Sequence, residues 1–320
     1  MTRALTIIPV VLLACLVLAS CQQKSETPRT PGNAGGYDED PVDRPPDPML
    51  LPPTYAEIRG MTVHGIENMP GSIPLVDGKW EDAASRKSVS LARDFVREGD
   101  VRRDGNPPDA VVLLGASYGG TGDIIHLAVV SKRGDDIGNV ATAVVGDRVQ
   151  VRGARIEGDG RIVLQVVQAG PHDAMCCPGE TAERIWKLDG GVLKEVPSAA
   201  PRGRLALADL DGWWELHYWD RDETASRPIS ITFQNGVAAG SGGCNQFHAD
   251  VRAGDAPGDI TFVHATRTLM ACGEPKDSLE TRFLSQLNGV TKFSFVATEL
   301  ALTYRVGDKI GTMLFMKSNQ

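Results

Sequence analysis

The sequence is poor in aromatic residues and has no excess of positive charge. Phe, Trp and Tyr make up 6% of its 320 residues, and 33 Lys and Arg stand against 41 Asp and Glu, for a formal net charge of −8. Nucleic-acid-binding proteins commonly carry a basic patch, and proteins held to anionic lipid by charge carry basic clusters. The charge balance therefore argues against both classes. The 35 glycines indicate many turns rather than a helical bundle, and the length suggests two domains.

Long apolar runs are scarce, and one of them, residues 7–19, lies at the N-terminus. It is too short to span a bilayer comfortably and is typical of the core of a signal peptide. It ends in Leu18-Ala19-Ser20-Cys21, which resembles the lipobox of bacterial lipoproteins. The resemblance implies a signal peptide at residues 1–20, cleavage before Cys21, and a diacylglycerol and a further acyl chain such as palmitate on Cys21.

The next segment, residues 22–54, holds eight of the 20 prolines and almost no large apolar side chains. Such a segment cannot bury enough apolar surface to offset its ordering entropy, so we predict a disordered tether. Gln22, rather than Asp, follows the cysteine. In a Gram-negative cell this favours the outer membrane, with the protein facing the periplasm. The folded remainder is then expected in an oxidising compartment of the cell envelope.

Residues 55–200 are predicted to form a β-rich domain. Short β-branched runs recur between Gly-Asp and Gly-Gly turns, which favours an antiparallel sheet that curls or pairs with a second layer. Gly146-Asp147-Arg148-Val149 and the later stretch from Pro171 to Pro178 resemble a segment of uncharacterised bacterial lipoproteins of the LppP/LprE type. The resemblance covers about residues 95–196 and implies a genuine domain without an assigned activity.

This domain contains a pair of adjacent cysteines, Cys176 and Cys177. A vicinal disulfide is the preferred interpretation. Free thiols and two bridges to other chains are alternatives. A soft-metal site with His172 is another, although adjacent cysteines rarely both reach one ion. We therefore predict no metal and no cofactor here.

The same domain also contains a serine in a G-x-S-x-G pattern, Gly115-Ala116-Ser117-Tyr118-Gly119. In serine hydrolases this pattern turns from a strand into a helix, which exposes the nucleophile. Here a second glycine-rich stretch and the β-type run 124–130 follow instead of a helix. The sequence therefore favours a hairpin loop over a catalytic Ser117.

The most specific pattern lies in residues 205–317. A G-S-G-G-C-N-x-F motif at 240–247 precedes the stretch Thr266-Arg267-Thr268-Leu269-Met270-Ala271-Cys272. Pro275 then opens a predicted helix with the apolar stripe Leu279, Phe283, Leu284 and Leu287.

This order of motifs resembles the META/HslJ domain, with Gly243, Cys244, Asn245, Met270, Ala271 and Cys272 as family motif residues. The resemblance implies an α+β, mainly β fold, in which a curled antiparallel sheet packs against one helix. It also implies an envelope protein linked to stress and drug tolerance, without an established catalytic activity.

Two cysteines of these motifs, Cys244 and Cys272, end predicted strands. A structural disulfide is the favoured interpretation, and it would close a loop worth about 3.5 kcal/mol. Two buried free cysteines, or a redox or metal role, are the alternatives. No C-x-x-C pattern or nearby histidine pattern supports the last of these.

The sequence as a whole predicts a non-catalytic envelope lipoprotein with two β-rich domains on a tether, with a binding or structural role in envelope stress or drug tolerance. Its expected partners are the membrane, through the lipid on Cys21, and an envelope protein, but no nucleic acid. The alternatives are a periplasmic inhibitor or ligand-binding protein, and a serine hydrolase that uses Ser117.

Overall fold

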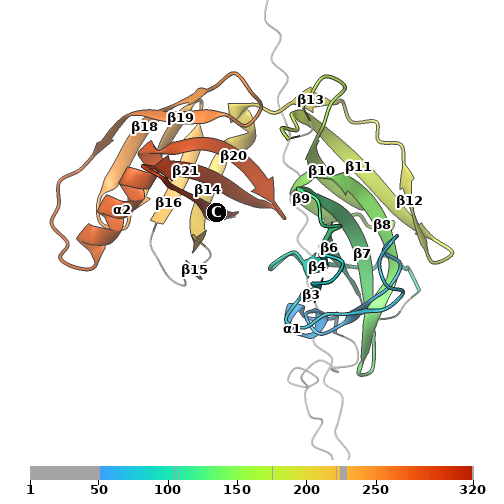
Figure 1. Ribbon diagram of the computed structural model, residues 1–320. Coiled ribbons are helices and arrows are strands. Elements are labelled where there is room, and N and C mark those ends of the chain that lie inside the picture. The colour runs from blue at the N-terminus through green and yellow to red at the C-terminus, as the bar shows by residue number, and fades with distance from the viewer. Residues whose placement is uncertain are drawn as a thin grey trace, which may run out of the picture. The chain divides into compact units, whose positions relative to one another are not determined.

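The computed structural model describes residues 51–318 except 105, 107, 175, 221 and 224–228. The predicted signal peptide, Cys21 and nearly all of the tether lie outside the described residues. Within that part of the chain, no helix is long and apolar enough to cross a membrane. The strands form three sheets, which confirms the predicted mainly β fold class (Figure 1).

The first sheet has the strand order β2-β1-β8-β7-β6-β4-β3, with β5 beside β6, and its strands pair antiparallel except β1 with β8. A single helical turn, α1 (Tyr55–Ile58), precedes it, and Thr54 and Glu57 cap this turn reciprocally. The strands are β1 (Thr62–Val63), β2 (Ile73–Pro74), β3 (Lys79–Asp82), β4 (Lys87–Leu91), β5 (Arg97–Gly99), β6 (Asp109–Ser117), β7 (Asp123–Arg133) and β8 (Asp136–Asp147).

The second sheet has the order β12-β11-β10-β9, with β13 beside β11. All of its pairings are antiparallel. Its strands are β9 (Gln150–Ile156), β10 (Ile162–Gln168), β11 (Glu180–Asp189), β12 (Val192–Val196) and β13 (Gly203–Arg204).

These two sheets pack face to face, so the second sheet is the second layer that the sequence predicts as one alternative. Val111 and Leu113 of β6 join Leu164 and Trp186 of the second sheet in one buried cluster. The alternate residues of β6, such as Val112, point to the opposite face and are buried against the segment from Ile58 to Leu75. Because both faces of β6 are covered, its residues 110–114 are apolar without interruption.

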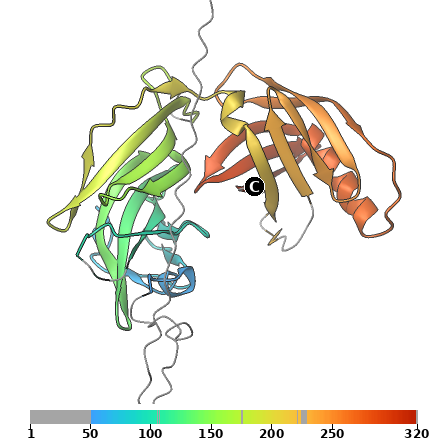
Figure 2. The same ribbon diagram turned by 180° about the vertical axis from the view of Figure 1, so that it is seen from behind.

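The third sheet is antiparallel and strongly curled, and its colours run from yellow to red in Figures 1 and 2. Its order is β19-β18-β17-β16-β14-β22-β21-β20, with β15 beside β14. A short 3-10 turn, η2 (Leu207–Leu210), leads into it. The strands are β14 (Gly212–Trp219), β15 (Asp222–Glu223), β16 (Ile229–Gln234), β17 (Val237–Gly242), β18 (Gln246–Ala253), β19 (Ile260–Arg267), β20 (Val290–Val296), β21 (Glu299–Val306) and β22 (Lys309–Lys317).

The curl brings the two edge strands of this sheet, β19 and β20, close to each other. The predicted helix, α2 (Lys276–Asn288), connects these two edges and packs against β17, β19 and β21. Its Phe283 and Leu287 are buried in the same core as Trp214 and Trp219. The aromatic residues are few, but three of the five tryptophans lie in this sheet, and Trp214 and Trp219 fill the interior of the curl.

Candidate functional site

The site begins with the three glycines of the G-S-G-G motif, each of which is required for a different reason. A Cβ on Gly240 would lie 2.0 Å from the backbone oxygen of Ser230, because β16 and β17 approach closely. A Cβ on Gly242 would lie 3.0 Å from the side chain of Glu280. Gly243 has a φ of +105°, which a residue with a side chain rarely adopts. The motif therefore shapes the end of β17 around a carboxylate from α2.

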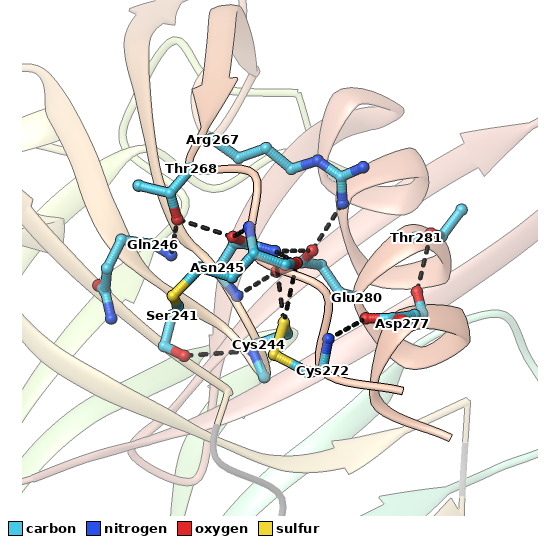
Figure 3. Close-up of polar contacts among 12 residues, drawn as sticks. Ser241, Cys244, Asn245, Gln246, Arg267, Thr268, Cys272, Asp277, Glu280 and Thr281 are labelled. Carbon is cyan, nitrogen blue, oxygen red and sulfur yellow. Dashed lines mark hydrogen bonds and ion pairs between the residues drawn. A yellow bond between two sulfur atoms is a disulfide. The ribbon is translucent and has the colours of Figure 1, made fainter. Parts of the chain in front are cut away.

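Asn245 lies at the centre of the site and is 2% exposed. Its Oδ1 accepts hydrogen bonds from Met270 N at 2.7 Å and from Thr268 Oγ1 at 2.8 Å. Its Nδ2 donates to the Met270 carbonyl at 3.1 Å. One side-chain amide therefore binds both backbone groups of Met270, as a neighbouring strand would, and fixes the segment that follows β19. Figure 3 shows the same amide hydrogen-bonded to Thr268, the first residue of that segment.

Glu280 lies beside Asn245 and is 1% exposed. Its carboxylate accepts from Asn245 N at 2.5 Å, from Asn245 Nδ2 at 2.8 Å and from Arg267 Nη1 at 2.6 Å. A buried charge is costly unless it is paired and hydrogen-bonded, and Arg267 supplies the opposite charge. The carboxylate thus ties α2, the end of β19 and the G-S-G-G motif together.

The predicted disulfide between Cys244 and Cys272 is present, with a Cα–Cα distance of 5.9 Å. Asp277, in the first turn of α2, accepts the backbone N–H of Cys272 at 3.1 Å and that of Gly273 at 3.0 Å. The segment 268–273 is therefore held at Thr268 and Met270 by Asn245, and at its other end by the disulfide and by Asp277. We call residues 268–273 the clamped segment.

Comparison with known protein families finds a match for the part of the chain that holds this site. Residues 206–319 match the META domain. We call these residues the META region. No protein with a curated description matches the chain. One solved structure, the NMR structure of a protein from Burkholderia xenovorans, is similar at 22% identity over 39% of this chain and 96% of its own, with a TM-score of 0.29.

The family motif residues of the META region meet at one place. Gly243, Cys244 and Asn245 leave β17 directly opposite Met270, Ala271 and Cys272. Neither Glu280 nor Arg267 was recognised as a site residue from the sequence. A signal for Glu280 was available, since it lies three residues before Phe283 and seven before Leu287, on the apolar face of the helix.

The outer side of the clamped segment carries two exposed apolar side chains. Leu269 is 88% exposed and Met270 is 59% exposed. Beside them lies a hollow of about 260 Å³, which Arg267, Asp277 and Thr281 also line. Both carboxylate oxygens of Glu280 are occupied by internal donors, so the arrangement suits the rigid presentation of a surface better than acid–base chemistry.

A second polar cluster of the META region was not predicted from the sequence. Asp220 accepts from Tyr304 OH at 2.5 Å and pairs with Arg282 and Lys309, each at 2.9 Å. Burial and the Asp220 carboxylate raise the pKa of Tyr304 to about 12. Burial alone would raise the pKa of Asp220, but the hydrogen bonds and cations around it lower that pKa below its usual value. The cluster joins the end of β14 to α2, β21 and β22.

The structure places Ser117 at the end of β6, where it pairs with Asp123 at the start of β7. The G-x-S-x-G pattern is thus part of an antiparallel hairpin, as the sequence favours. A strand, β7, follows it in place of the helix that a nucleophile elbow requires.

The vicinal disulfide predicted for Cys176 and Cys177 is absent, and this prediction is wrong. Both residues have free thiols, of which that of Cys176 is exposed. A disulfide requires specific distances and dihedral angles, which neighbouring residues reach only with strain. The exposed thiol of Cys176 is therefore available to solvent chemistry, whereas the sulfurs of Cys244 and Cys272 are bonded to each other.

Proposed function

We propose that this chain is an envelope lipoprotein whose META region binds a protein partner, without catalysis, through the clamped segment. Leu269 and Met270 form the apolar contact and Arg267 its polar rim. The N-terminal β-rich part is a further envelope domain of the LppP/LprE type. The biological role that follows is the binding or support of an envelope protein during stress or drug exposure.

The observation that carries this proposal is the exposure of Leu269 and Met270 on a segment that has little freedom to bury them. Single exposed apolar residues are ordinary on protein surfaces. Here two of them are adjacent. The side chain of Asn245 holds the backbone of Met270, and the disulfide and Asp277 hold the same segment at Cys272 and Gly273. A contact segment that is ordered before binding loses less conformational entropy in the complex.

The residue types agree with a protein partner. Met and Arg are enriched at protein–protein interfaces, where a central apolar contact is surrounded by polar groups. Arg267 lines the same hollow as Met270, and its side chain is 39% exposed while one of its nitrogens is bound to Glu280. The hollow next to Leu269 would accept a small side chain of the partner.

The expected location follows from Cys21 and the tether, which are features of the sequence. Acyl chains on Cys21 anchor the mature chain stably, because several chains together bind membranes far more strongly than one. Gln22, which follows the cysteine, favours the periplasmic face of the outer membrane.

Site-specific photo-crosslinking in the producing cells tests the proposal. A photoreactive amino acid replaces Leu269 in the whole chain, and in a control chain it replaces Ile310, which is 57% exposed in the same region. We expect one dominant adduct of defined mass from position 269 and none of that mass from position 310. Adducts that are equal at both positions, or absent at 269, would contradict the proposal. A partner that is an enzyme inhibited by the chain would favour the inhibitor alternative.

A further inference from the structure

The disulfide of the META region lies beside the carboxylate of Asp277. One ligand atom each of Cys244, Cys272 and Asp277 lies within 4.8 Å of the other two. Cys244 and Asp277 are half-buried and Cys272 is exposed, so that solvent and ions reach the group from the side of Cys272. These three residues come from the turn after β17, the clamped segment and the first turn of α2.

We propose that reduction of this disulfide creates a binding site for one thiophilic divalent cation of the zinc class, with Cys244, Cys272 and Asp277 as ligands. In the reducing step a dithiol transfers two electrons and two protons to the disulfide and becomes a disulfide itself, while the S–S bond of Cys244 and Cys272 breaks. The cation then forms a bond to each sulfur, and the two thiol protons pass to solvent. In the oxidised chain the sulfurs are bonded to each other, so the site exists only after reduction.

The donor set fits such a cation. Zinc binds thiolate sulfur at about 2.3 Å and carboxylate oxygen at about 2.0–2.2 Å in tetrahedral geometry, and soft thiolates select it over magnesium or calcium. Two sulfurs on one zinc lie about 3.8 Å apart, against about 2 Å in a disulfide. Rotation of the Cys272 side chain, which is exposed, supplies this separation. Three protein ligands leave one tetrahedral position for water.

The surroundings of the three ligands support the bound form. The Asp277 carboxylate is already oriented by the N–H groups of Cys272 and Gly273, and each of its oxygens keeps a free lone pair. The N-terminus of α2, a helix of 13 residues, adds a favourable positive potential. Arg267 neutralises the nearby Glu280, which reduces the repulsion between that carboxylate and the thiolates.

This site is independent of the proposed partner, since it requires only the chain itself and a reductant. The proposed metal site gives the clamped segment two chemical states. In the oxidised state the disulfide links the segment to Cys244, and in the reduced state the metal ion links them.

The test is a cobalt titration of the whole chain, because Co²⁺ replaces zinc and reports thiolate ligands by charge-transfer absorption. A Cys176→Ser/Cys177→Ser background removes the free vicinal thiols. The protein is reduced with a phosphine, which adds no competing thiol. We expect one Co²⁺ per reduced chain with the charge-transfer band, and neither binding nor band for the oxidised chain.

Asp277→Asn is the decisive variant, since it keeps both cysteines and therefore folds with its disulfide before reduction. It should weaken cobalt binding by about tenfold or more. Asp308→Asn, an exposed aspartate of the same region, should leave binding within about twofold. Circular dichroism follows the fold throughout. Four results would each overturn the proposal. The first two are no cobalt binding by the reduced chain and an unchanged charge-transfer band in a Cys244→Ser chain. The other two are equal cobalt affinities of the two Asp variants and a reduced chain that unfolds and is not refolded by cobalt.

Discussion

The carboxylate of Glu280 is buried and joins α2 to Asn245 and to Arg267. Three donors, from the backbone and side chain of Asn245 and from Arg267, point at its two oxygens. At the scale of single residues it therefore has two functions in the META region. It compensates the cationic Arg267, and it fixes Asn245 so that the amide faces Met270.

Replacing Glu280 by Gln should destabilise the META region by about 2–4 kcal/mol. The new amide nitrogen would face at least one of three hydrogen-bond donors, and Arg267 would lose its counter-charge. Urea unfolding of the oxidised whole chain, followed by tryptophan fluorescence, measures this loss. Glu274→Gln is the matched control, because Glu274 is exposed, and it should change stability by less than about 0.5 kcal/mol. Equal stability of the two variants would refute the role assigned to Glu280.

The raised pKa of Tyr304 predicts that the folded protein loses stability at alkaline pH. Its folded pKa of about 12 lies above its ordinary value of 10.0, owing to burial and to Asp220. The stabilisation linked to the neutral phenol is therefore complete below pH 10 and is lost as pH rises toward 12. Relative to a Tyr304→Phe chain, the wild-type chain should lose about 1–2 kcal/mol between these pH values. Urea unfolding at a series of pH values measures the difference, and parallel pH curves for the two chains would contradict it.

At the scale of elements, β16 and β17 of the third sheet approach each other closely at Gly240. Gly240 faces Ile231 across this pair, and its Cα lies so near the backbone of Ser230 that no Cβ fits. Beyond that contact the chain turns at Gly243 and reaches Asn245. The position of the clamped segment is thus a consequence of strand packing as well as of the disulfide.

Gly240→Ala should therefore destabilise the META region by about 3 kcal/mol or more, because backbone has to move. Gly307→Ala serves as the control, because Gly307 has a φ of +58° and no described atom lies within 4 Å of the position that its Cβ would take. It should cost about 1–2 kcal/mol, which is the effect of left-handed backbone alone. Thermal unfolding of both variants compares them. A smaller loss for Gly240→Ala than for Gly307→Ala would contradict the packing account.

Elements with a local signal could be predicted from the sequence, and contacts between distant elements could not. The stripe from Leu279 to Leu287 specifies α2 by its own periodicity, and Gly289 follows its last residue as expected. By contrast, Asn245 and Glu280 are 35 residues apart, and their pairing exists only because α2 returns across the end of β17. The helical turn α1 was missed because one turn carries too few residues to show a period.

At the scale of the whole molecule, we propose that an anchored tether carries the two β-rich parts. The anchor predicts that cells fed labelled palmitate incorporate it into the wild-type chain and into a Cys176→Ser chain. A Cys21→Ser chain should contain no label and should keep the mass of the unprocessed precursor, since both acylation and cleavage require that cysteine. Gel fluorography and intact mass measure these outcomes. Label in the Cys21→Ser chain would contradict the assignment of the anchor.

The central claim is that Leu269 and Met270, held by the clamped segment, bind a protein of the envelope. The most direct measurement is the dissociation constant between the purified protein captured at position 269 and the oxidised whole chain. Replacing both residues by Ser should weaken binding about 100-fold, whereas Ile310→Ser should leave it within about twofold. Unchanged binding by the double variant, or an equal loss in Ile310→Ser, would contradict the claim.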